Sequence, residues 1–180
     1  MTIIFIGMKH CGKSTHGKAL AAAEGWDFLD TDDMLCDIYN RRNHCRLNVR
    51  EIFNRVGEDS FRMLEEEVMD MLLTLEGDRV VSMGGRMPVN EAVQAKMKQL
   101  GFTVFLKLPV EILFERVKRR GLPSFIDPAR PLESFTELYE KREPYYLRCA
   151  DLTVELENMP LEKASQIIFK RIREKINHAR

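Results

Sequence analysis

The four cysteines of this chain form no CxxC pair and no zinc-ligand spacing, and its 180 residues carry no net charge. The absence of these spacings predicts ordinary thiols in a reducing compartment rather than disulfides or a zinc centre. The 28 basic residues balance 28 acidic ones, so no global field favours nucleic acid or an anionic membrane as a partner. The chain lacks an apolar run of about 18 residues and opens without a basic, apolar leader, and we therefore expect a cytoplasmic protein.

Short apolar runs alternate with helical patterns along the chain. The pattern predicts strands at residues 2–6, 27–29, 79–83, 103–108 and 152–155. It predicts helices at residues 14–23, 34–75, 88–100, 110–119, 132–147 and 161–176. Strands that alternate with helices form parallel sheets covered on both faces. We therefore expect an α/β fold with a five-stranded parallel sheet sandwiched by helices, in one domain over residues 1–180.

A phosphate-binding motif follows the first predicted strand. Residues 7–14 read GMKHCGKS, which matches GxxxxGK[ST] between a strand and a helix. In this motif backbone N–H groups surround the phosphates, the lysine neutralises phosphate oxygens and the hydroxyl binds Mg²⁺. The motif predicts a P-loop fold of the nucleoside-monophosphate-kinase type, with Lys13 as a catalytic residue and Ser14 as a ligand of Mg²⁺. The expected ATP-binding residues are Gly7, Lys9, His10, Cys11, Gly12, Lys13, Ser14 and Thr15, with His10 and Cys11 acting only through their backbone.

Two carboxylates end the second predicted strand, in the sequence Asp30-Thr31-Asp32. Ligands of such sheets bind at the carboxyl ends of the strands, where these side chains emerge. A GTPase would need the guanine-reading sequence NKxD, and the chain does not contain it. The combination favours a small-molecule kinase, although helix capping is an alternative role for Asp30 and Asp32.

The motifs and their order resemble the shikimate kinase family. GMKHCGKST, DTD, GEDSFRMLE, SMGGR and EKREPYYLRCAD follow one another between residues 3 and 154 in the order typical of that family. The resemblance implies transfer of the γ-phosphate of ATP to a hydroxyl of shikimate, giving shikimate 3-phosphate and ADP in aromatic amino-acid biosynthesis. It implies Mg²⁺ as the cofactor and a monomer that binds ATP and shikimate, or a similar hydroxy acid.

The resemblance also implies roles on the acceptor side of the site. Asp30 would assist Mg²⁺ through its water shell, while Asp32 would bind the acceptor hydroxyls and help remove the reacting proton. Residues 31–76 would form the helical acceptor region, and residues 119–131 would form a lid over ATP. Further contacts would come from Arg62 and Arg142 on the substrate carboxylate, the N–H groups of Gly84 and Gly85 beside it, and Phe53 and Phe61 as pocket walls.

Alternative roles exist for the two arginines and for a basic segment. Arg62 could form a surface ion pair with Glu58 or Glu66, and Arg142 could pair with Glu140 or Glu143. The segment YNRRNHCR makes the connection after Asp32 longer than the family pattern. We expect a solvated basic turn there rather than a binding patch, because runs of charge are usually exposed. Its arginines are Arg41, Arg42 and Arg46.

The lid arginine has more than one candidate. Arg130 begins an Arg-Pro-Leu match, but it lies close to Arg142 and a predicted helix starts directly after it. Arg119 and Arg120 lie nearer the expected position, and we choose Arg120 as the catalytic, ATP-binding lid residue. Arg116 is expected to stack on adenine, with an exposed surface cation as the alternative.

Arg86 stands where the family has a third glycine. It either changes the choice of acceptor or points to solvent or to glutamates of the protein itself. Arg86 and the basic segment favour a kinase of a different small hydroxy acid or polyol as one alternative function. Arg86 and the unusual lid favour an ATP-binding protein without phosphoryl transfer as another.

Overall fold

A computed structural model describes residues 1–119, 121–123 and 126–178. The strands are β1 (Thr2–Ile6), β2 (Asp27–Asp30), β3 (Arg79–Ser82), β4 (Phe102–Lys107) and β5 (Leu152–Glu155). The helices are α1 (Lys13–Glu24), α2 (Thr31–Asn43), α3 (Val49–Thr74), α4 (Glu91–Leu100), α5 (Val110–Lys118), α6 (Pro131–Cys149) and α7 (Leu161–His178). A short 3₁₀ helix, η1 (Met87–Val89), precedes α4.

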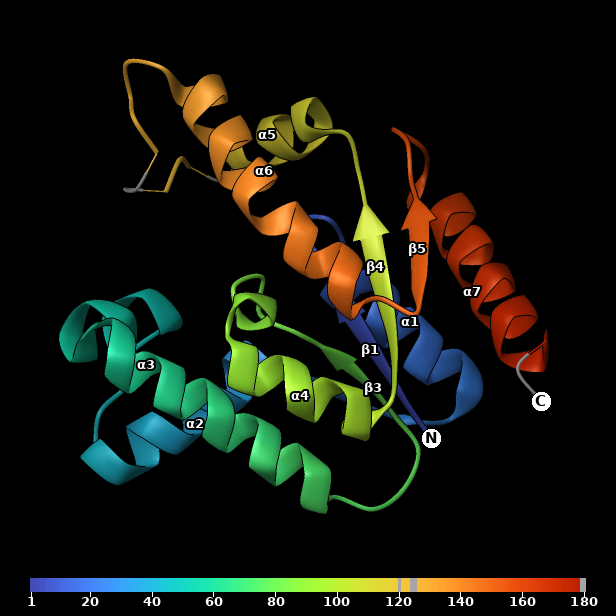
Figure 1. Cartoon of the computed structure of the whole chain (residues 1–180), viewed down its shortest axis with the longest axis horizontal. Coiled ribbons are helices and arrows are strands. Elements are labelled where there is room, and N and C mark those ends of the chain that lie inside the picture. Colours follow the sequence, from blue (N-terminus) through green and yellow to red (C-terminus); the bar gives the residue numbers. More distant parts are fainter. Residues whose placement is uncertain (120, 124–125, 179–180) are drawn as a thin grey trace.

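The five strands form one parallel sheet in the order β2-β3-β1-β4-β5. This arrangement confirms the predicted parallel sheet. The central strand β1 pairs with β3 on one side and with β4 on the other. The phosphate motif follows β1 and the double glycine follows β3, so both segments leave neighbouring strands at the same edge of the sheet. Figure 1 shows β4 pointing toward α5, while α2, α3 and α4 lie together at the lower left.

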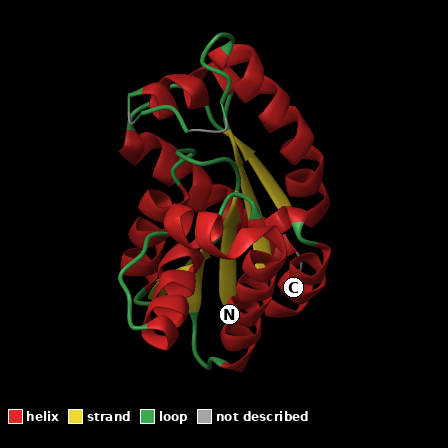
Figure 2. Ribbon diagram, turned by 90° about the vertical axis from the view of Figure 1, so that its left-hand side faces the viewer, coloured by secondary structure: helices red, strands yellow, loops and turns green. Residues whose placement is uncertain are grey.

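Alternate side chains of β1 pack into two different hydrophobic cores. Ile3 and Phe5 pack with residues of α1, α5 and α7, whereas Ile4 and Ile6 pack with residues of α2, α3 and α4. Because both faces are buried, the strand is apolar throughout rather than alternating. Figure 2 shows the strands between helices on both sides. Within the part of the chain that the structure describes, no helix combines the length and apolar character needed to cross a membrane.

The region expected to be helical from residue 34 to 75 consists of two helices, and the first begins earlier than predicted. Asp30 caps α2 because its Oδ1 accepts a hydrogen bond from the Asp32 N–H at 3.0 Å. α3 is kinked at Gly57, whose φ of 79° and ψ of 178° are not helical. The prediction that a helix starts at Pro88 was wrong: Pro88 lies in η1, and Asn90 caps α4.

Candidate active site

The loop between β1 and α1 presents backbone N–H groups at the edge of the sheet. Gly7 has a φ of 138°, and a Cβ there would lie 2.8 Å from the carbonyl oxygen of Leu106. Gly12, with a φ of 104°, occupies the N-cap position of α1, so no side chain caps this helix. The first turn reads Lys-Ser-Thr and contains no acid. Its free N–H groups therefore suit an anion such as phosphate.

Lys13 and Arg116 donate hydrogen bonds to carbonyl oxygens of this loop. The Nζ atom of Lys13 donates to the carbonyl oxygens of Gly7 at 3.0 Å and Met8 at 3.1 Å, and only 8 % of Lys13 is exposed. Arg116 on α5 donates from Nη1 to the carbonyl oxygen of His10 at 3.3 Å. The candidate phosphate-binding and adenine-binding cations thus contact the same loop.

Ser14, Asp30 and Ser82 bring oxygen atoms together beside the loop. The Ser14 hydroxyl donates to Asp30 Oδ2 at 2.8 Å, and Ser14 Oγ lies 3.0 Å from Ser82 Oγ. A hydroxyl and a carboxylate fit Mg²⁺, which prefers oxygen ligands and commonly uses one or two protein groups together with phosphates. Asp30 therefore caps α2 with one oxygen and reaches Ser14 with the other. Sequence reasoning missed Ser82, although a polar residue at the end of an apolar strand was a usable signal.

The double glycine joins the acceptor side of the site to the phosphate loop. A Cβ at Gly84 would lie 2.5 Å from Asp32 Oδ1. A Cβ at Gly85 would lie 3.3 Å from the carbonyl oxygen of Gly7 and 3.4 Å from the N atom of Lys9. A side chain at Gly84 would displace the Asp32 carboxylate, and one at Gly85 would be in tight contact with the backbone of the phosphate loop. The double glycine therefore lies close to both.

One expected role of Gly84 needs correction. Its N–H donates to the Thr31 hydroxyl oxygen at 2.8 Å, so this group is engaged within the protein instead of facing a substrate carboxylate. Thr31 is fully buried between Asp30, which is partly buried, and Asp32, which is exposed. Sequence reasoning treated Thr31 only as part of a motif and missed this contact.

The pKa of the Asp32 carboxyl is raised, as suits a candidate general base. It is accessible to solvent, yet the protein packed around it disfavours the charged form and raises the pKa of its carboxyl above the ordinary value. The Asp30 carboxylate raises this pKa further, whereas Lys13 and Lys9 oppose the shift. A raised pKa makes a carboxylate a better proton acceptor near neutral pH.

Arg62 and Arg86 share one carboxylate oxygen. Oε1 of Glu58 lies 2.8 Å from Arg62 Nη2 and 2.6 Å from Arg86 Nη2. The ion pair expected as an alternative for Arg62 is thus present, and Arg86 contacts a glutamate of the protein itself. The Arg86 guanidinium also lies 5.0 Å from the centre of the Phe53 ring, which packs edge-on against Phe61.

Helix α6 contacts both the loop and the double glycine. Arg142 Nη1 lies 3.9 Å from Met8 Sδ, and the Tyr146 hydroxyl donates to the carbonyl oxygen of Gly85 at 2.5 Å. Glu143, one suggested partner of Arg142, instead pairs with Lys107 at 3.0 Å. Tyr146 is fully buried and was missed because nothing local in the sequence distinguishes it from an ordinary core residue.

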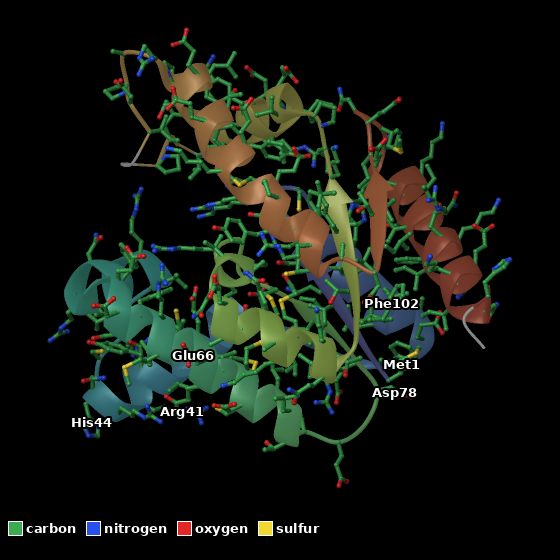
Figure 3. The ribbon with its side chains drawn as sticks, in the orientation of Figure 1. Met1, Arg41, His44, Glu66, Asp78 and Phe102 are labelled. Atoms are coloured by element: carbon green, nitrogen blue, oxygen red, sulfur yellow. The ribbon has the colours of Figure 1, made fainter. Side chains whose placement is uncertain are left out.

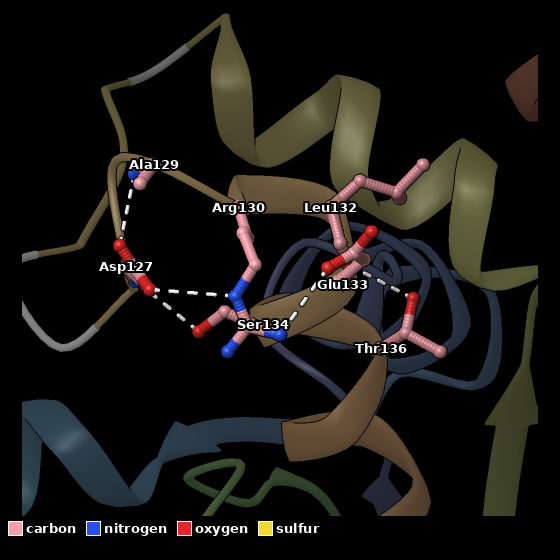
Figure 4. Close-up of polar contacts among 7 residues, drawn as sticks. All are labelled: Asp127, Ala129, Arg130, Leu132, Glu133, Ser134 and Thr136. Carbon is pink, nitrogen blue, oxygen red and sulfur yellow. Dashed lines mark hydrogen bonds and ion pairs between the residues drawn. The ribbon is translucent and has the colours of Figure 1, made fainter.

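Figure 4 shows the polar contacts of Arg130, one of the lid candidates. Its guanidinium lies 3.7 Å from Asp127 and 3.3 Å from Glu133, and the residue occupies the N-cap position of α6. Arg130 therefore lies directly before a helix, as the sequence predicted, and its side chain does not cap that helix. Arg119 follows α5 directly. Arg120, our preferred lid residue, lies outside the described residues.

The basic segment lies at the end of α2. Arg41 pairs with Asp37 at 3.7 Å and Arg42 pairs with Glu67, and both arginines are largely exposed. Figure 3 shows Arg41 and His44 at the lower left, beside the end of α2 that points away from β4. The expected exposure of Arg41 and Arg42 is confirmed, but both lie in the last turn of α2 instead of a separate turn after it.

A buried carboxyl that sequence reasoning missed lies near the arginines. Glu65 is 3 % exposed, and its Oε2 accepts a hydrogen bond from Asn90 Nδ2 at 3.4 Å. Burial raises the pKa of Glu65 to about 7, while Asn90 and Arg86 lower it in part. Glu65 is therefore partly protonated at neutral pH.

Replacing Glu65 with glutamine is expected to change how stability depends on pH. The folded protein binds the Glu65 proton more tightly than the unfolded chain, whose ordinary pKa is 4.5. The stabilisation of the folded protein by this bound proton is complete below pH 4.5 and is lost as the pH rises through about 7. Relative to Glu65→Gln, the wild type should lose on the order of 2–3 kcal/mol of unfolding free energy between pH 5 and 8. Urea unfolding at both pH values measures this difference, and parallel changes in the two proteins would contradict it.

Comparisons with known proteins agree with this geometry. The family model described as shikimate kinase matches residues 9–173. The chain is 34% identical over 169 residues to the shikimate kinase of Aquifex aeolicus, covering 94% of this chain and 95% of that protein. It is 35% identical over 152 residues to the shikimate kinase of Rhizobium meliloti, covering 84% and 75%.

Two solved structures of similar fold are shikimate kinases. The shikimate kinase of Acinetobacter baumannii in complex with shikimate superposes with a TM-score of 0.82 at 27% identity, covering 96% of this chain and 93% of that one. The Aquifex aeolicus enzyme gives a TM-score of 0.76 at 31% identity, covering 98% of each chain. With its phosphate loop, paired carboxylates and double glycine in one site, the chain belongs to the shikimate kinase family.

Proposed function

We propose that the protein transfers the γ-phosphate of ATP to a hydroxyl of shikimate, giving shikimate 3-phosphate and ADP in aromatic amino-acid biosynthesis. The observation that carries this proposal is the close approach of Asp32 and the phosphate loop on either side of Gly84 and Gly85. A hydroxyl bound at Asp32 would lie next to a phosphate bound by the loop. The relative from Acinetobacter baumannii was solved with shikimate, which supports this choice of acceptor.

Donor binding is assigned to the loop and to the cations beside it. Lys13 and the N–H groups of residues 7–15 would bind the phosphates, and Arg116 would contact adenine from α5. Ser14 and Asp30 would hold Mg²⁺. When bound, Mg²⁺ supplies positive charge to the phosphates. Arg120 within a lid at residues 119–131 would add a further charge.

Acceptor binding is assigned to residues 31–76 together with α6. Asp32 would accept the proton of the attacking acceptor hydroxyl. The oxygen of that hydroxyl would bond to the γ-phosphorus as the bond to ADP breaks and ADP leaves. Arg62 and Arg142 would bind the substrate carboxylate, since guanidinium groups form strong paired hydrogen bonds with carboxylates. Phe53 and Phe61 would line the same pocket.

The proposal also treats residues 1–180 as one domain that acts as a monomer in the cytoplasm. The four cysteines are free within the described residues, which suits a reducing compartment. Gel filtration with light scattering would test the oligomeric state.

Product identification tests the proposed reaction. The purified protein is incubated with Mg-ATP and shikimate, and the products are examined by mass spectrometry and ³¹P NMR. We expect a monophosphate ester at one ring hydroxyl and an equal amount of ADP. ADP without a phosphorylated acceptor would contradict phosphoryl transfer to shikimate.

The sequence left a different small hydroxy acid or polyol open as the acceptor, and the family match and the shikimate-bound neighbour favour shikimate over it. A panel of cyclic and linear hydroxy acids, measured by coupled ADP release, separates the two. Our proposal requires shikimate to have the highest kcat/KM of the panel.

Replacing Arg62 with alanine is expected to raise the KM for shikimate about 10- to 100-fold, because one charged hydrogen-bonding partner of the carboxylate is lost. The KM for ATP should stay within twofold of the wild type. Arg173→Ala, which removes an exposed arginine on α7, outside the residues assigned to the acceptor, is the matched control. An unchanged KM for shikimate in Arg62→Ala would contradict the role of Arg62.

A further inference from the structure

Arg86 is held in place by both halves of the kinked helix α3. Phe53 lies before the kink at Gly57 and Glu58 directly follows it, and the Arg86 guanidinium contacts both side chains. Only 33% of the Arg86 side chain is exposed, less than the 46% of Arg62. Arg86 therefore has a defined position beside the double glycine.

The guanidinium groups of Arg62 and Arg86 converge on one point. Nη2 of each lies within hydrogen-bonding distance of Glu58 Oε1, at 2.8 and 2.6 Å. Two arginines arranged in this way around a carboxylate can bind another carboxylate at the same place. The two arginines carry two positive charges against the single negative charge of Glu58, and the buried Glu65 nearby is partly protonated at neutral pH, so the cluster keeps a positive charge that attracts an anion.

Glu58 is the most exposed member of this cluster. Its side chain is 51% exposed on the surface of α3, and exposed ion pairs contribute little to stability. The hydrogen bond from Arg62, and then the charge of Arg86, lower the pKa of Glu58, which therefore stays ionised and competes with other carboxylates.

We propose that Arg86 binds the acceptor carboxylate together with Arg62, and that this carboxylate displaces Glu58 from both guanidinium groups. The inference rests on the proposed function, because it takes shikimate as the acceptor. Arg86 is then a specificity-determining residue that requires an acceptor with a carboxylate. Glu58 is the internal counterion of the two arginines when no acceptor is bound.

Charge variants at Arg86 test this role with two acceptors, shikimate and its uncharged methyl ester. Arg86→Met removes the charge and keeps most of the length, while Arg86→Lys keeps the charge without the planar group. In Arg86→Met we expect the KM for shikimate to rise about tenfold, with kcat within threefold of the wild type. The KM for the ester should change less than twofold, and Arg86→Lys should be intermediate.

Glu58→Gln removes the internal counterion and should lower the KM for shikimate about two- to fivefold, because the acceptor no longer displaces a charged group. An increase would overturn the counterion role. Arg173→Met, which removes an exposed, paired arginine on α7, is the matched control and should leave both KM values unchanged. If Arg86→Met does not fold, as judged by thermal unfolding, Arg86→Lys and Glu58→Gln decide the outcome.

Equal effects of Arg86→Met on the acid and the ester, or no effect on either, would overturn the inference. Calorimetric titration with shikimate separates this failure from failure of the proposed function. A wild type that binds shikimate in an Arg86-dependent way without releasing ADP would contradict the reaction and support the carboxylate site. A wild type that neither binds nor phosphorylates shikimate would overturn both.

Discussion

Replacing Lys13 with alanine is expected to lower kcat about a thousandfold or more. Nζ of Lys13 is the charged group that the loop itself holds, by hydrogen bonds to the carbonyl oxygens of Gly7 and Met8. Phosphoryl transfer depends on positioning and on neutralising phosphate charge, and removal of one such group commonly costs two to three orders of magnitude in rate. Alanine cannot supply that charge to the phosphates.

Single-turnover and steady-state ADP release measure this effect. Lys18→Ala, on the same helix but exposed and 5.5 Å from the Phe28 ring, is the matched control and should keep kcat within twofold of the wild type. Thermal unfolding of Lys13→Ala shows whether the loop still folds without its internal hydrogen bonds. A folded Lys13→Ala protein with kcat within tenfold of the wild type would contradict the assigned role.

Replacing Asp32 with asparagine is expected to lower kcat about a hundredfold or more, because the amide cannot accept the proton of the attacking hydroxyl. The KM for ATP should change little, since Asp32 lies on the acceptor side of Gly84. The raised pKa of Asp32 means that its charge is disfavoured in the folded protein. Asparagine should therefore leave the melting temperature equal to or slightly above that of the wild type.

The pairing of lost activity with retained stability distinguishes a catalytic role from a structural one. Asp33→Asn, in the same turn of α2 and exposed, is the matched control with an expected kcat near the wild-type value. The pH dependence of kcat gives an independent check, because the acidic limb should disappear in Asp32→Asn. A fall in melting temperature with unchanged kcat would contradict the assignment of Asp32 as the base.

Local sequence patterns predicted much of the fold and of the donor side. The apolar run before Gly7 and the spacing of Gly7, Gly12 and Lys13 determine the strand, loop and helix because their physical causes act over a few residues. Asp30 and Asp32 could be placed at the sheet edge for the same reason. The strand ends were within one or two residues of those observed.

Contacts between distant segments could not be predicted in this way. The hydrogen bond from Tyr146 to Gly85 and the shared oxygen of Glu58 depend on how α3 and α6 pack against the sheet. The kink at Gly57 and the 3₁₀ turn at Pro88 each interrupt a pattern that looked continuously helical. Arg86 illustrates this limit of prediction from sequence. The sequence showed that an arginine replaces the third glycine of the family, but only the packing of α3 showed that Arg86 contacts Glu58 and Phe53.

Release of ADP from Mg-ATP by the purified wild type, measured with and without shikimate, tests the central claim most directly. If the double glycine joins an ATP site to a shikimate site, ADP release should be slow with Mg-ATP alone and rise at least a hundredfold with saturating shikimate. Tight ATP binding with the same slow ADP release in the presence and absence of shikimate would contradict it.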